Sequence, residues 1–190
     1  MIGLNPETVI EDSLETAFSL RTYVGILDTI QQDHFVATTE FKKIFNGFYK
    51  VRQRSSDWYD KYYKLMEEQK STNRSFKDLL LSLEPVSQTI DVSFVSKLMA
   101  SVDPSLPIWD KYVLQNLELL SRWEKLADKD KMLRIYEADR IYQEIKTWYE
   151  TFIGSKDGKK CIAAFDTAIP SYKDKLTAVK KIDFLLWSKR

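Results

Sequence analysis

The sequence predicts an all-α protein that folds as a single compact helical domain. Only five glycines and five prolines interrupt the 190 residues, and no stretch alternates strictly between apolar and polar residues. Apolar residues instead recur at intervals of three and four, which is the spacing of an amphipathic helix. With 44% hydrophobic and 13% aromatic residues, the chain can bury a sizeable core. No repeat or long linker divides it, so we expect one domain over residues 1–190.

The first two predicted helices begin at recognisable caps. Asn5, followed by Pro6 at the first helical position, predicts a helix that ends around Gly25. Thr38 or Thr39 is expected to cap the next helix, in which aromatic and aliphatic residues recur at helical spacing up to Tyr49.

Two further helices are predicted in the segments DWYDKYYKLMEEQK and FKDLLLSLE. Ser55 or Ser56 begins the first, Ser75 caps the second, and Pro85 ends it from just beyond. The tryptophan and tyrosines of the first segment follow helical spacing, which is more typical of core packing than of a base-stacking platform.

The second half of the chain predicts four more helices. A stripe from Val113 to Trp123 indicates one, and residues 131–152 indicate the longest, closed by Gly154. Two short helices follow, separated by Pro170. In the last of them we expect three apolar residues to dock in the core: Ile182, Leu185 and Leu186.

The residue inventory excludes several kinds of site. His34 and Cys161 are the only histidine and cysteine, so a Cys/His zinc site lacks ligands and a Ser-His-Asp or Cys-His site lacks support. No glycine occurs between Phe48 and Ile153, which excludes glycine-rich phosphate loops there. We expect no cofactor. The absence of a basic and apolar leader, and of any apolar run of membrane-spanning length, predicts a cytoplasmic protein without a membrane span.

Charge is unevenly distributed, although the formal net charge is only +1. Residues 1–40 hold seven acidic side chains and one basic, whereas residues 154–190 hold nine basic and four acidic. The two ends could face each other or simply be solvated. Alternatively, the C-terminal region forms a phosphate-facing surface. Its candidate contacts are Lys159, Lys160, Lys180, Lys181 and Arg190.

The segment SFVSKLMASVDPSLPIWDKYV contains the strongest candidate for a functional carboxylate. Asp110 precedes a helix signal, so it is either a helix cap or an active-site group. Lys97 lies thirteen residues earlier, on a helix capped by Ser93 or Ser96. A helix, a turn and a second helix would bring the lysine and the aspartate together. We therefore predict a cleft with Lys97 and Asp110 as catalytic residues, lined also by Ser93, Ser96 and Trp109.

The segments SFVSKLMASVDPSLPIWDKYVLQNL and KKIDFLLWSKR together resemble a group of uncharacterised bacterial proteins. Their shared pattern is SFxSKLL, a proline-rich turn, PIWD, a helix and then KKIDFxLW. These proteins are in turn distantly similar to the helix-hairpin-helix DNA glycosylase superfamily. That resemblance implies that Lys97 and Asp110 occupy the lysine and aspartate positions of those enzymes. The aspartate would stabilise positive charge on the sugar of a flipped nucleotide, and the lysine would attack the sugar carbon.

Two departures from the glycosylase pattern keep a second hypothesis open, and one of them is that Lys97 and Asp110 are several residues closer in sequence than in that pattern. The hairpin of these enzymes uses glycines to bring its backbone close to DNA phosphate, and QTIDVSFVSK contains none. The first hypothesis is thus a DNA-associated protein that acts on a base or an abasic sugar of duplex DNA. The second is a non-catalytic helical protein that binds a protein partner or a small ligand.

Overall fold

The structure, a computed structural model, describes residues 13–188, with side chains described for residues 19–186. Every regular element in this range is a helix. The α-helices are α2 (Ser13–Ile30), α3 (Thr39–Tyr49), α4 (Ser56–Thr72), α5 (Phe76–Leu83), α6 (Val92–Val102), α7 (Lys111–Asn116), α8 (Leu120–Glu124), α9 (Lys131–Gly154), α10 (Lys156–Ala168) and α11 (Ala178–Ser188). Two short 3-10 helices, η1 (Glu84–Val86) and η2 (Pro170–Tyr172), complete the set. The all-α prediction is confirmed for this part of the chain.

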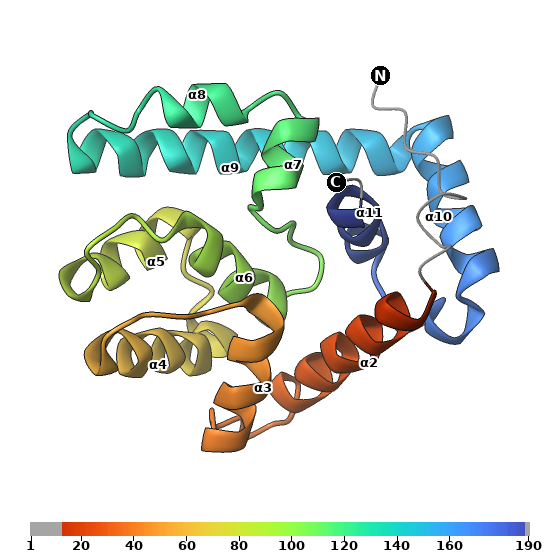
Figure 1. The fold of residues 1–190 in the computed structure, drawn as a ribbon, viewed down its shortest axis with the longest axis horizontal. Helices are drawn as coiled ribbons and strands as arrows, with labels where there is room; N and C mark the ends of the chain where they lie inside the picture. The colour runs from red at the N-terminus through yellow and green to blue at the C-terminus, as the bar shows by residue number, and fades with distance from the viewer. Residues whose placement is uncertain (1–12, 189–190) are drawn as a thin grey trace.

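The helices form two groups that meet in the middle of the molecule (Figure 1). Helices α3 to α6 form one group, in which α6 packs against both α4 and α5. Helices α7 to α11 form the second group. Its long helix α9 packs against α10 and α11, and also against α5 of the first group. Helix α2 contacts α3 and α6, and α11 contacts α7. Elements from both halves of the sequence therefore surround the centre.

Three helix starts are capped as the sequence predicts. The side-chain oxygens of Thr38, Ser55 and Ser75 each accept a hydrogen bond from the backbone N–H three residues later, at 3.2 Å in every case. Each bond satisfies one of the N–H groups that a helix start leaves without an intrahelical partner. These caps fix the start of α3, α4 and α5.

Helix α2 is longer than predicted, because it continues through Gly25 to Ile30. A Cβ atom added at Gly25 would meet nothing within 4 Å, so no packing constraint bends the helix there. Ile26 and Ile30 lie beyond the glycine and are both buried. Their burial outweighs the cost of about 1 kcal/mol for a glycine in a helix. The predicted start at Asn5 and Pro6 lies outside the described residues.

Helix α6 begins one residue after Asp91, earlier than the predicted serine caps. Ser93 and Ser96 therefore lie inside the helix. The buried carboxylate of Asp91 does not cap it, but accepts hydrogen bonds from Arg54 at 2.7 Å and from the indole N–H of Trp58 at 2.8 Å. Asp91 thus ties the segment before α6 to α4.

The stripe from Val113 to Trp123 forms two short helices instead of the single one predicted. Helix α7 ends at Asn116, and Glu118 adopts a left-handed conformation with φ 60° before α8 starts at Leu120. No glycine or proline marks this break in the sequence.

The last helix belongs to the core, as predicted. Ile182, Leu185 and Leu186 are fully buried, each with 0% of its surface exposed. The aromatic residues of α4 are core residues too, because Trp58, Tyr62 and Tyr63 are all buried. No helix in the described range is long and apolar enough to cross a membrane.

Candidate active site

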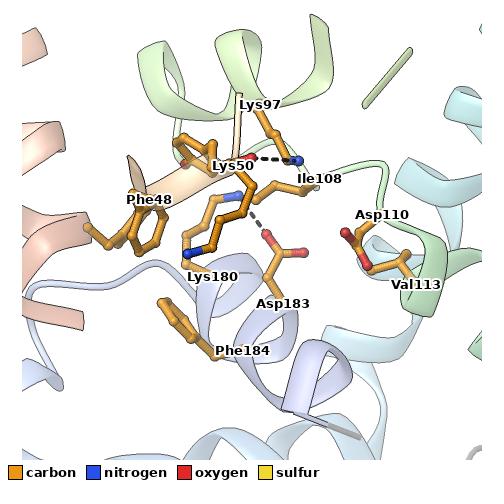
Figure 2. Close-up of a pocket in the computed structure, with 11 residues that line it drawn as sticks. Phe48, Lys50, Lys97, Ile108, Asp110, Val113, Lys180, Asp183 and Phe184 are labelled. Atoms are coloured by element: carbon orange, nitrogen blue, oxygen red, sulfur yellow. Dashed lines mark hydrogen bonds and ion pairs between the residues drawn. The ribbon is translucent and has the colours of Figure 1, made fainter. Parts of the chain in front are cut away.

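A pocket of about 240 Å³ opens where the two groups of helices meet (Figure 2). Its walls come from α2, α3, α6, α7 and α11 and from the loop before α7. Lys97 and Asp110 both line it, so the structure brings the two predicted catalytic residues together. The full lining is Tyr23, Phe48, Tyr49, Lys50, Lys97, Ile108, Asp110, Val113, Lys180, Asp183 and Phe184.

Lys97 extends from α6 into the pocket, and its amine is held only loosely. The Nζ atom donates a long hydrogen bond of 3.4 Å to the backbone carbonyl of Tyr49. It also lies 5.4 Å and 5.9 Å from the ring centres of Phe94 and Tyr49. Burial lowers the pKa of Lys97 below its ordinary value, and the negative charge of Asp110 opposes this shift in part. The lowered pKa increases the fraction of neutral amine, which is the nucleophilic form.

Asp110 is both a helix cap and a charged group of the pocket. Its Oδ1 atom accepts a hydrogen bond of 2.9 Å from the backbone N–H of Tyr112, at the start of α7. The same carboxylate points into the pocket that holds the Lys97 amine (Figure 2). Asp110 can therefore cap α7 and act as a charged group of the pocket at the same time, so the sequence alternatives of helix cap and active-site group do not exclude each other.

A second lysine and a second aspartate form a buried ion pair in the pocket wall. Lys180 Nζ lies 2.6 Å from Asp183 Oδ2, and both residues are almost completely buried. Tyr149 donates a hydrogen bond of 2.6 Å to the other oxygen of Asp183. Burial raises the pKa of Asp183, although Lys180, Tyr149 and the backbone of Ile108 each act in the opposite direction. Lys180 is thus a fixed, paired cation, whereas none of the ion pairs within residues 13–188 includes Lys97.

Aromatic side chains form most of the remaining wall. Tyr23 contacts Phe48 and Phe184, with ring centres 6.1 Å and 5.9 Å apart, and so links α2 to α3 and α11. The buried Tyr23 hydroxyl has no hydrogen-bond partner among the residues that the structure describes. Burial also raises the pKa of Tyr23 and Tyr49, which keeps both phenols neutral. The pocket therefore combines flat apolar walls with a few polar groups, as small-molecule sites commonly do.

The other residues predicted for the cleft do not line the pocket. Ser96 is buried, and its hydroxyl accepts a hydrogen bond of 2.9 Å from the backbone N–H of Trp109. Trp109 packs in the core between Phe76 and Trp123. Ser93 accepts the hydroxyl of Ser96 through its backbone carbonyl. These residues support the loop that leads to Asp110, and their side chains do not form the pocket surface.

The predicted phosphate-facing surface is only partly supported by the positions of its lysines. Lys159 and Lys160 are exposed on α10. Lys180 and Lys181 are buried, which corrects the prediction for these two residues, because each ammonium group is paired inside the protein. The fifth candidate, Arg190, lies outside the described residues.

Sequence analysis missed several residues of the pocket. Lys50 follows α3 in a left-handed conformation with φ 56° and lines the pocket, and it was not among the residues predicted for the cleft. Asp183 had a detectable signal, because an aspartate inside an otherwise apolar helix segment needs a partner when it is buried. In the described part of the chain, no cluster of three or more His, Cys, Asp or Glu residues could hold a metal ion.

The weakly held amine of Lys97 and the carboxylate of Asp110 line the same pocket. Such an amine can add to an electron-poor carbon, and the carboxylate can stabilise positive charge that develops nearby. Comparison of the chain with protein-family models, curated proteins and solved structures gives no match.

Proposed function

We propose that the protein binds duplex DNA and acts on a base or an abasic sugar through Lys97 and Asp110. The observation that carries this proposal is the convergence of the two side chains on one aromatic-walled pocket, with the pKa of the lysine lowered by burial. A flipped nucleotide is read in such pockets by stacking and by hydrogen bonds. Phe48 and Phe184 supply flat surfaces for stacking, and the exposed Lys50 at the rim supplies a positive charge for phosphate.

The chemistry follows from the two groups. At an abasic sugar, the neutral Lys97 amine adds to the C1′ aldehyde carbon, and the carbonyl oxygen takes one proton from the amine and one from the solvent and leaves as water, which gives an iminium ion. At an intact nucleotide, the bond from C1′ to the base breaks and its electron pair leaves with the base. Asp110 then stabilises the positive charge on the sugar while Lys97 bonds to C1′.

The arrangement of helices supports a glycosylase-like fold as part of the same proposal. Helix α5, the connection that ends at Asp91, and α6 would correspond to the helix-hairpin-helix unit, and Asp110 at the start of α7 would correspond to the aspartate. The connection contains no glycine. It is held instead by Asp91, which also accepts hydrogen bonds from the hydroxyls of Ser87 and Thr89.

Trapping with borohydride tests the proposal. Incubation of the protein with a duplex that contains an abasic site, followed by reduction, should give a covalent adduct that Lys97→Gln abolishes. Lys111→Gln is the matched control, because Lys111 is exposed next to Asp110 but does not line the pocket. An adduct that persists in Lys97→Gln, or the absence of an adduct with both abasic and damaged duplexes, would contradict the proposal.

A second function, the binding of a small ligand without catalysis, is favoured by one observation. Lys180 and Lys181 are paired internally, which leaves fewer cations on the C-terminal region for phosphate. Salt distinguishes the two functions, because affinity for DNA falls steeply with salt as bound counterions are released. A protein that shows no salt-dependent binding of duplex DNA would fit the second function.

A further inference from the structure

The loop between α6 and α7 has no regular structure, yet side chains from two other helices, α9 and α11, and from the residue before α11 hold its backbone. Lys180 donates a hydrogen bond of 2.9 Å to the carbonyl of Leu106, and the backbone of Ile108 bonds to Asp183. Tyr142 on α9 donates to the carbonyl of Pro107 at 3.0 Å. Thr177, just before α11, donates to the carbonyl of Pro104 at 2.6 Å. Through these contacts, the loop is anchored mainly to α9 and the α11 region.

Lys180 and Asp183 differ from the other anchors because they also line the pocket. Lys180 bonds to the backbone four residues before Asp110, and Asp183 bonds to the backbone two residues before it. Tyr149 on α9 donates a hydrogen bond to the second oxygen of Asp183. A buried ion pair of this kind is weak evidence for stability, since the loss of hydration offsets most of the attraction. The ion pair between Lys180 and Asp183 is better explained by its hydrogen bonds to the loop, which fix the position of the loop backbone.

We infer that Lys180 and Asp183 are positioning residues, which hold the Asp110 carboxylate at the Lys97 amine. This inference rests on the proposed function, in which Asp110 acts beside Lys97. The segment KKIDF thus contacts the segment that leads to Asp110, because Lys180 holds Leu106 and Asp183 holds Ile108.

An apolar version of the cluster separates positioning from stability. The triple variant Tyr149→Phe, Lys180→Met and Asp183→Leu replaces the three partners with apolar side chains of similar shape. Such replacements are commonly neutral for folding, whereas removal of one partner leaves a buried charge unpaired. The variant should fold but should lose the two contacts that hold the loop.

The first readout is the titration of Lys97, followed by NMR in protein labelled at the lysine ε-carbon. Because the charge of Asp110 raises the pKa of Lys97, displacement of Asp110 in the triple variant should lower the titration midpoint of Lys97. In an Asp110→Asn background, the triple variant should cause no further shift. The same shift in both backgrounds would mean that the cluster acts on Lys97 directly, and would overturn the inference.

The second readout is amide hydrogen exchange at Trp109, which should become about tenfold faster in the triple variant. Lys181→Met with Asp166→Leu is the matched control, because this neighbouring pair lies at 2.5 Å, also joins α11 to another helix, and does not touch the loop. Equal acceleration in the control would show general loosening of α11 and would also overturn the inference.

Neither readout requires activity, so the inference and the proposed function can fail separately. If the parent protein gives no borohydride adduct, the proposed function fails while the titration and exchange still test the position of Asp110. If the parent gives an adduct with a duplex that carries an intact damaged base, the rate of its formation at saturating DNA should fall about tenfold in the triple variant, with the DNA affinity unchanged. An unchanged rate would overturn the inference.

Discussion

Substitution of Asp110 separates its two roles, because one oxygen caps α7 and the charge faces Lys97. In Asp110→Asn, the amide oxygen can still accept the 2.9 Å hydrogen bond from the N–H of Tyr112. The free energy of unfolding should therefore stay within about 0.5 kcal/mol of the parent value. In Asp110→Ala this bond is lost, and the free energy of unfolding should fall by about 1 kcal/mol. Urea denaturation followed by circular dichroism measures both values.

The charge of Asp110 is lost in both variants, so their effects on Lys97 should be equal. The pKa of Lys97 should fall further below its ordinary value, because the one group that raises it in the folded protein is gone. Formation of the borohydride adduct with a duplex that carries an intact damaged base should be abolished in Asp110→Asn, because Asp110 stabilises the charge on the sugar at that step, even though the variant is as stable as the parent.

Asp130 provides the control for capping alone. It caps α9 by accepting hydrogen bonds from the backbone N–H groups of Met132 and Leu133, and it is exposed and outside the pocket. Asp130→Asn and Asp130→Ala should reproduce the stability pattern without changing the titration of Lys97. If Asp110→Asn leaves both the Lys97 titration and the adduct unchanged, Asp110 is a cap and nothing more, and the reasoning is refuted.

Three further outcomes follow from the pocket and the core. Lys97→Met should raise the free energy of unfolding at neutral pH by about 0.5–2 kcal/mol. Because the pKa of Lys97 is lowered in the folded state, the folded parent binds fewer protons than the unfolded chain. The stability of the parent should therefore rise with pH towards 10.5, and the difference in stability between parent and variant should disappear. Tyr23→Phe should raise the melting temperature slightly, since it removes a buried hydroxyl without a partner, and a loss of about 1 kcal/mol would contradict that assignment. Leu185→Ala should lower the free energy of unfolding by about 2–5 kcal/mol, because this side chain is fully buried. Leu133→Ala is the control: its residue is 47% exposed, so the loss should be less than about 0.5 kcal/mol. Equal losses of stability in thermal denaturation would argue against the packing of α11.

Local signals predicted the helices well, because caps and apolar spacing act over a few residues. Thr38, Ser55 and Ser75 begin their helices as expected, since each oxygen finds its N–H partner three residues later. The break near Glu118 was missed because a positive φ at a residue other than glycine leaves no mark in the sequence. Similarly, Gly25 was taken as a helix end although buried residues on both sides hold α2 together.

The meeting of Lys97 and Asp110 was predictable, because one short connection joins α6, which carries Lys97, to α7, which Asp110 caps. The positions of Lys180 and Lys181 were not, since a run of basic residues does not reveal which of them has a carboxylate partner. Lys181 pairs with Asp166, which lies on a different helix. Pairings between distant elements depend on how the helices pack, and that information is not present in local spacing.

The pocket is built from residues that lie between positions 23 and 184 of the chain, which has a consequence for how the protein matures. A single domain generally folds as a unit. Until α11 has been synthesised and has docked, the pocket wall that Lys180 and Phe184 form is missing. Docking of α11 completes the burial that lowers the pKa of Lys97. The lowered pKa of Lys97 is thus a product of the complete fold and not a property of the segment that carries it.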